Sequence, residues 1–165
     1  MSKDTWISDI LAGEYDGQEV ELKGWIYRSR GSNKIRFIVI RDSTGNIQCV
    51  AKRDVLGDVF FDELKSSLIE SSVILKGIVK STDREHGHEL QVLSGEIVGS
   101  VNPERPFPIT ESAMAEADGG ETEFLLDNRH LYLRTSRMTT MLKIRSSVFG
   151  AVHSYFRDRQ FIEYQ

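Results

Sequence analysis

Cationic and aromatic side chains are interleaved along one short stretch of the chain, from residue 23 to residue 41. The stretch has six basic residues and no acidic one, namely Lys23, Arg28, Arg30, Lys34, Arg36 and Arg41. Three aromatic residues lie among them: Trp25, Tyr27 and Phe37. Cations neutralise phosphates, and flat rings offer unpaired bases a surface for stacking. The stretch therefore predicts a face that binds single-stranded nucleic acid, RNA in particular.

The same residues also have structural interpretations. A register shift of one residue would exchange the two faces of a strand and turn Phe37 into a core residue. Trp25 and Tyr27 fit the cover of a barrel end better than base contacts. A separate alternative is that the six cations form an ordinary solvated face.

The whole chain is acidic, so the basic stretch runs against the average. A formal net charge of -4 over 165 residues excludes a protein that coats nucleic acid by bulk charge. It leaves room for a local basic groove, because a ligand responds to nearby charges. The length suits one domain, or a small domain with part of a second.

Several classes of protein are excluded by what the sequence lacks. Cys49 is the only cysteine, so neither an intrachain disulfide nor a cysteine zinc cluster can form. The N-terminal segment MSKDTWISDILAG lacks the apolar run of a signal peptide. The sequence contains no run of about 18 apolar residues, which is the length needed to span a bilayer. We expect a cytoplasmic protein without membrane association.

Two polar groups resemble sites only superficially. Asp83, His86 and His88 have no further ligand nearby, so they fit a polar hairpin loop and we expect no metal. Arg129, His130 and Arg134 fit a packing or nucleic-acid-backbone role near a domain junction, and we expect no catalytic residue.

The elements that must position the basic stretch follow from the apolar periodicity. Residues 5–13 predict a short helix capped by Thr5. A period of two from Val20, and again in the segments 35–41 and 46–51, predicts three strands. Two more are predicted over 72–79, which is rich in Val, Ile and Leu, and over 89–98, which follows a polar loop. The segment 55–69 predicts one helix, with Val59, Phe60, Leu64 and Leu68 recurring at helical steps. This order favours a mainly β, five-stranded Greek-key barrel of the OB type with a helix between strands 3 and 4; a generic small α+β sheet is the alternative.

Alternation assigns the side chains to faces. Val20, Leu22, Gly24 and Ile26 share one face of the first strand, and Trp25 and Tyr27 lie on the other. In the second strand Ile38 and Ile40 share a side with Arg36, and Phe37 points to the other. In the third strand Ile47, Cys49 and Ala51 alternate against Gln48.

The character of the chain changes after residue 102. All three prolines, Pro103, Pro106 and Pro108, lie within six residues, and the acidic stretch Glu111–Glu123 follows. This composition predicts a linker or hinge over 103–123, between a barrel domain over 1–102 and a helical part over 124–165. An apolar stripe at helical period predicts a long helix over 139–159.

Four blocks of the sequence, in this order, resemble one enzyme family: GWIYRSRGSNKIRFIVIRDSTGNIQ, PFPIT, FLLDNRHLYLR and KIRSSVFGAVHSYFRDRQFIEYQ. They are similar to the N-terminal region of asparaginyl- and aspartyl-tRNA synthetases, class II enzymes with an OB-fold anticodon-binding domain. RHL followed by an aromatic residue is closer to the asparaginyl enzymes. Lysyl enzymes share the fold and match less well. The resemblance covers essentially the whole chain.

The resemblance implies that the barrel recognises the anticodon of a tRNA. Phe37 corresponds to the ring that stacks on the central uridine, and Gln48 to the amide that hydrogen-bonds an anticodon base. Glu89 corresponds to the acidic residue of the last strands, and Arg28 and Arg30 to the basic pair after GW. Lys34, Arg36 and Arg41 are expected to support the basic face.

The resemblance also implies the chemistry of a parent enzyme. That enzyme would activate asparagine with ATP and Mg, esterify tRNA(Asn), and form a homodimer through motif 1, which the long helix and FIEYQ resemble. The segment 124–165 would begin an incomplete catalytic domain. Because the later motifs are absent, we expect this fragment to be inactive and to bind no cofactor. Two alternatives stay open: a fragment of an aspartyl-tRNA synthetase, and a stand-alone OB-fold protein that binds single-stranded nucleic acid. The blocks over 124–165 favour a synthetase, because a stand-alone barrel has no need of them.

Overall fold

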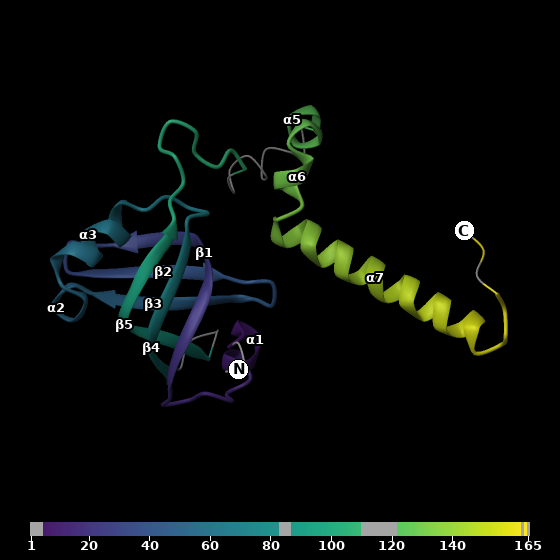
Figure 1. Cartoon of the computed structure of the whole chain (residues 1–165), viewed down its shortest axis with the longest axis horizontal. Coiled ribbons are helices and arrows are strands. Elements are labelled where there is room, and N and C mark those ends of the chain that lie inside the picture. Colours follow the sequence, from purple (N-terminus) through teal and green to yellow (C-terminus); the bar gives the residue numbers. More distant parts are fainter. Residues whose placement is uncertain (1–4, 83–86, 110–121, 163, 165) are drawn as a thin grey trace. The chain divides into compact units, whose positions relative to one another are not determined.

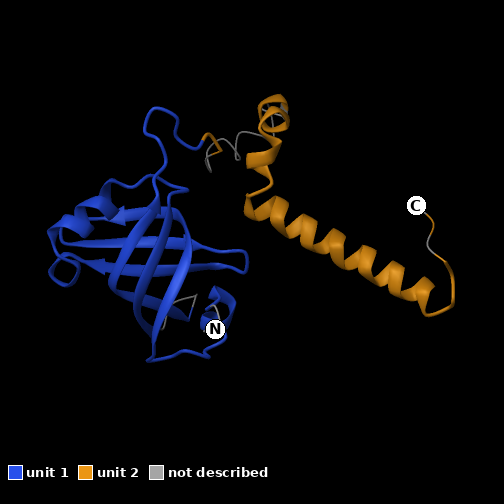
Figure 2. Ribbon diagram, in the orientation of Figure 1, with its two compact units in different colours: residues 1–107 blue, residues 108–165 orange. Residues whose placement is uncertain are grey.

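The computed structural model describes residues 5–82, 87–109, 122–162 and 164. The chain divides into two compact units, Met1–Phe107 and Pro108–Gln165 (Figure 2). This division falls within the predicted linker 103–123, of which residues 110–121 lie outside the described part.

The first unit is a closed barrel of five strands (Figure 1). The strands are β1 (Glu19–Gly31), β2 (Ile35–Arg41), β3 (Asn46–Lys52), β4 (Ser72–Ser81) and β5 (His88–Gly99). Their order around the barrel is β1-β2-β3-β5-β4, in which β3 and β5 pair in parallel and all other pairs are antiparallel. The predicted mainly β, five-stranded OB barrel is confirmed.

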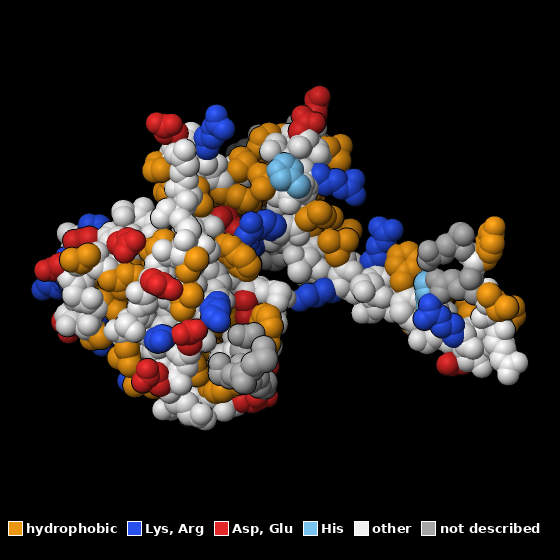
Figure 3. Space-filling view, in the orientation of Figure 1, with side chains coloured by type: hydrophobic (Ala, Val, Ile, Leu, Met, Phe, Trp, Pro, Cys, Tyr) orange, Lys and Arg blue, Asp and Glu red, His pale blue; other side chains and the backbone are white. Residues whose placement is uncertain are grey.

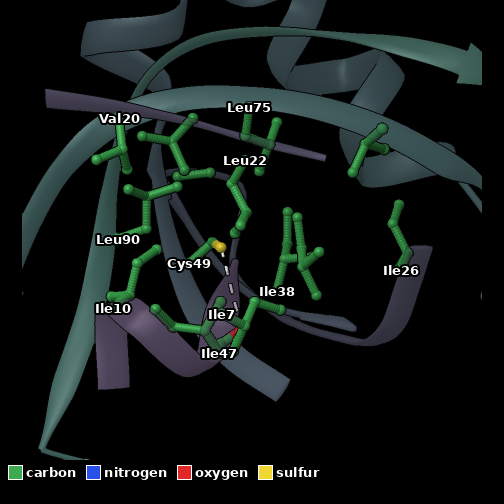
Figure 4. Packing of buried hydrophobic residues seen from close by; sticks show 14 of the residues in the cluster. Ile7, Ile10, Val20, Leu22, Ile26, Ile38, Ile47, Cys49, Leu75 and Leu90 are labelled. Atoms are coloured by element: carbon green, nitrogen blue, oxygen red, sulfur yellow. Dashed lines mark hydrogen bonds between the residues drawn. The ribbon is translucent and has the colours of Figure 1, made fainter. Parts of the chain in front are cut away.

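The barrel interior is filled by the residues that alternate inward. Leu22 and Ile26 of β1, Ile38 of β2, Cys49 of β3 and Leu90 of β5 have no exposed surface, and their side chains point toward one another (Figure 4). The predicted inward faces of β1, β2 and β3 are confirmed by this core. Because Ile38 is buried, its neighbour Phe37 must lie on the opposite face.

Helix α1 (Ile7–Leu11) contributes Ile7 and Ile10, both fully buried, to the same core. The predicted cap by Thr5 is wrong, because the cap position is Trp6, whose side chain makes no capping bond. Instead, the turn between β2 and β3 supplies the acceptors. Asp42 Oδ2 accepts from the Ile7 N–H at 2.9 Å, and Thr44 Oγ1 accepts from the Ser8 N–H at 3.0 Å.

The region between β3 and β4 is helical, as predicted, but it is not one helix. It consists of α2 (Arg53–Leu56) and α3 (Asp58–Ser66), interrupted at Gly57. Gly57 has φ 75°, in the left-handed region that breaks a helix and favours glycine. The break changes which side chains face the barrel. Leu64 is buried, as the predicted apolar face requires, and Phe61 is buried as well. Val59, predicted to lie on that face, is instead 86% exposed.

The second unit is helical in its described part, with α5 (Thr122–Asp127), α6 (Arg129–Tyr132) and α7 (Ser136–Arg157). The predicted long helix begins three residues earlier than expected, because Thr135 caps it: Thr135 Oγ1 accepts from the Met138 N–H at 3.4 Å. Large apolar side chains of α7 are exposed, among them Met141, Ile144, Val148, Val152 and Tyr155. Hydrophobic and basic side chains both appear on its surface in Figure 3. No helix in the described ranges has the length and apolar character to cross a membrane.

Candidate nucleic-acid interface

Two rows of outward-facing residues cross four neighbouring strands of the barrel, and we call them together the outer face. Strand register places Arg28, Val39, Gln48 and Glu89 in the first row, and Arg30, Phe37, Val50 and Gln91 in the second. Each row therefore takes one residue from β1, β2, β3 and β5. All five residues predicted to contact the anticodon, Arg28, Arg30, Phe37, Gln48 and Glu89, lie on this face.

A bulge in β1 puts the two arginines there. The register runs from Ile26 opposite Ile40 directly to Arg28 opposite Val39, so Tyr27 is the extra residue. Strict alternation from the buried Ile26 would have turned Arg28 and Arg30 into the barrel. The bulge resets the alternation, as β-bulges do. Both arginines are consequently exposed, on the side of Phe37.

Ring and cation lie close together on the outer face. Phe37 is half-buried, and its ring centroid is 6.0 Å from the Arg30 guanidinium carbon. The Tyr27 ring in the bulge has two such neighbours, Arg28 at 5.5 Å and Arg41 at 5.6 Å. These distances fit cation–π attraction, which holds the arginine side chains beside flat surfaces on which a base can stack.

The polar groups of the outer face form a short chain of hydrogen bonds. Gln48 Nε2 donates to Glu89 Oε2 at 3.1 Å, and Gln91 Nε2 donates to Glu89 Oε1 at 2.6 Å. The sequence analysis did not single out Gln91. Its position two residues after Glu89, in a strand of period two, was the signal that could have identified it.

The three residues expected to support the basic face lie in different surroundings. Lys34 is exposed in the turn between β1 and β2. Arg36 shares the inward side of Ile38, and its guanidinium donates to Ser29 Oγ at 2.7 Å. Arg41 is largely buried and donates to both carboxylate oxygens of Glu70, at 2.7 and 2.9 Å. Its charge is thereby compensated, whereas Arg28, Arg30 and Lys34 are all exposed to solvent.

The turn that carries Lys34 is anchored to the helices after β3. The Arg53 N–H donates to the Lys34 carbonyl at 3.0 Å, and Arg53 Nε donates to the Asn33 carbonyl at 2.7 Å. Lys65 Nζ donates to Asn33 Oδ1 at 2.8 Å. Arg53 is itself held by Asp58 and Asp62. These bonds fix one end of the outer face without using its own side chains.

Among the described residues, no three metal-binding side chains come together; Asp83 and His86 of the weighed metal group lie outside the described part. Cys49 is fully buried, and burial raises the pKa of its thiol well above the ordinary value. A neutral, inaccessible thiol is a packing residue.

The sequence family described as "OB-fold nucleic acid binding domain" matches residues 20–98. The asparagine--tRNA ligase of Thermoplasma acidophilum is 39% identical over 160 residues, which cover 96% of this chain and 35% of that protein. The chain spans about a third of the length of the curated relatives that it matches.

Solved structures also match this chain over its whole length and over about a third of their own. The asparaginyl-tRNA synthetase of Pyrococcus horikoshii, crystallised in complex with asparaginyl-adenylate, matches with a TM-score of 0.87 and 32% identity over 100% of this chain and 36% of its own. A putative aspartyl-tRNA synthetase from Leishmania major Friedlin matches with a TM-score of 0.81 and 23% identity, over 100% of this chain and 34% of its own. At that identity the likeness concerns the fold alone.

Proposed function

We propose that the outer face binds the anticodon loop of a tRNA, because residues 20–98 match the family described as "OB-fold nucleic acid binding domain". The observation that carries the proposal is the convergence of a ring, two exposed cations, an amide and a carboxylate on one face. Single-stranded RNA is recognised through such sets, since rings stack on bases, cations meet phosphates, and amides and carboxylates meet base edges.

Each residue of the outer face has a separate role in this proposal. Phe37 stacks on the central base, a contact that any base can make. Selectivity therefore depends on Gln48 and Glu89, whose polar atoms meet the edges of bases. Arg28 and Arg30 neutralise phosphates, and Lys34 extends that charge along the turn. The Arg41–Glu70 pair acts indirectly, by holding Arg41 beside the Tyr27 ring.

For the whole protein we propose asparagine--tRNA ligase activity, as in the relatives named above. The asparaginyl-adenylate held by the Pyrococcus horikoshii structure supports ATP as co-substrate, with Mg²⁺ bound to its phosphates. No residue of this chain is assigned to that chemistry, which belongs to the remaining length of the relatives. Such a role places the protein with the translation machinery in the cytoplasm.

We further propose that α7 pairs with a second copy of the chain. Met141, Ile144, Val148, Val152 and Tyr155 follow one another at helical spacing and are all about half exposed. An exposed apolar stripe of this kind marks an interaction surface. The sequence resemblance implies a homodimer, which favours a second copy of the chain as the partner.

The anticodon proposal is tested with tRNA anticodon stem-loops that carry GUU, GUC or an unrelated triplet. We expect the GUU loop to bind more tightly than the unrelated loop, and the ratio of GUU to GUC affinity to separate asparagine from aspartate identity. Equal binding of all three loops would contradict anticodon recognition and favour a stand-alone module without base selectivity.

The same loops test the basic face through the salt dependence of binding. With Arg28, Arg30 and Lys34 neutralising phosphates, the logarithm of the affinity should fall with the logarithm of the salt concentration at a slope of about -2. The Arg28→Ala and Arg30→Ala variants should each reduce that slope. A slope near zero would contradict the role of the cations.

A further inference from the structure

The carboxylate of Glu89 is held on both oxygens by neutral amides. Gln48 of β3 donates to one oxygen at 3.1 Å, and Gln91 of β5 donates to the other at 2.6 Å. Gln48 and Glu89 are register partners across the parallel β3–β5 pair, and Gln91 is the next outward-facing residue of β5. All three side chains are partly buried, so the bonds form in surroundings where they are stronger than in bulk water.

These bonds determine which way the Gln48 amide faces. An ionised carboxylate only accepts hydrogen bonds, so the group that Gln48 turns to Glu89 must be its NH₂. The carbonyl oxygen and the second N–H of the amide are then offered to a ligand in one order only. A glutamine without such a partner can rotate its amide by half a turn and offer them in the reverse order.

The order decides which bases fit. Along the Watson–Crick edge, uracil offers a carbonyl acceptor followed by the imino N–H donor, whereas cytosine offers an amino donor followed by an acceptor nitrogen. Where the base turns its ring positions 4 and 3 to the amide, an amide with fixed polarity can form a two-bond pair with one of these bases and not with the other. An amide that is free to turn can pair with both. The Glu89 contact therefore converts a general hydrogen-bonding group into a selective one.

We propose that Gln91 is a positioning residue for base selection by Gln48, acting through the Glu89 carboxylate. The inference rests on the proposed binding of an anticodon loop. Gln91 holds the second oxygen of Glu89, so the carboxylate cannot turn away from Gln48 and the Gln48 amide keeps its polarity. Gln91 itself does not contact the base. The quantity that it controls is the discrimination between uracil and cytosine at one anticodon position.

The test uses the 165-residue chain and three stem-loops, GUU, GCU and GUC, which differ by a single U-to-C change at the second or third base. Gln91→Met keeps the length of the side chain and removes the donor. Gln91→Leu also removes the donor and adds no charge, so it decides the case if the Met variant does not fold. Gln91→Lys restores a donor. Gln18→Met is the matched control, since Gln18 is exposed and lies outside the outer face.

We expect the wild type to bind the U and C loops with different affinities at one of the two positions. Gln91→Met or Gln91→Leu should narrow that affinity ratio about threefold to tenfold, the range of one hydrogen bond. Gln91→Lys should keep the ratio of U to C affinities, even though its charge raises the affinity for every loop. Gln18→Met should change neither the ratio nor the affinities. An unchanged ratio in a folded donor-less variant, or an equal loss for every loop, would overturn the role of Gln91. A wild type without any preference among the loops would instead overturn the anticodon proposal itself.

Discussion

Phe37 and Ile38 are neighbours in sequence with opposite environments. Ile38 is fully buried in the barrel core, and Phe37 lies half-buried on the outer face beside Arg30. A ring that is not needed to fill the core is available for stacking on a base. This separation lets one substitution affect binding and the other affect stability.

We expect Phe37→Ala to weaken binding of the GUU stem-loop by about 1–3 kcal/mol, the usual contribution of stacking on one base. The free energy of unfolding should fall by only about 1 kcal/mol or less, because the ring is outside the core. Ile38→Ala is the matched control and should lose about 2–5 kcal/mol of stability through the cavity that it creates. Binding titrations and urea unfolding measure the two quantities. A Phe37→Ala variant as unstable as Ile38→Ala would identify Phe37 as a core residue.

At the scale of elements, short segments depend on bonds from distant parts of the chain. Helix α1 is five residues long, too short to be stable alone. The turn between β2 and β3 caps it through Asp42 and Thr44. The same Asp42 carboxylate organises its own turn, because Oδ1 accepts from the Thr44 N–H at 2.6 Å and from the Gly45 N–H at 2.9 Å. Asp42 thus joins the turn to the helix that closes the core.

Asp42→Ala should therefore destabilise the barrel by about 1–3 kcal/mol, since it removes a helix cap and leaves several N–H groups without their acceptor. Asp42→Asn keeps one acceptor oxygen and should lose less. Thermal or urea unfolding of both variants, followed by circular dichroism, gives the comparison. Wild-type stability in the Asp42→Ala variant would show that the cap contributes nothing.

At the scale of the whole molecule, the two units hide their apolar residues to different degrees. The barrel buries a continuous core, whereas α7 leaves large apolar side chains exposed along its length. The proposed RNA binding involves the barrel alone, and the proposed pairing involves the exposed apolar stripe of α7. The proposed second copy supplies a partner surface for this stripe, as a symmetric pairing of the same helix in both chains.

We expect the chain to associate with itself and Ile144→Asp to shift it toward the monomer, because a charge in an apolar interface has to be desolvated. Ser146→Asp places the same charge two residues away, on another side of the helix, and should leave the association intact. Sedimentation equilibrium over a range of concentrations measures both. A monomeric wild type, or equal effects of the two variants, would contradict pairing through this stripe.

The periodicity of the sequence determined most of the barrel. The first three strands, their inward faces and the outward position of Phe37 follow from alternation, which depends only on neighbouring residues. The change of composition after residue 102 likewise predicted two parts. The order of four sequence blocks led to the family, and with it to Gln48 and Glu89.

Only the tertiary structure decided how these residues combine. The bulge at Tyr27 turns Arg28 and Arg30 outward, and pairing with β2 rather than local alternation creates it. Gln48 and Glu89 are 41 residues apart and meet because β3 and β5 pair. Arg41 was predicted to support the basic face, but its charge is compensated by Glu70. Each of these facts depends on contacts between distant segments, and a local pattern contains no information on which segments will pair.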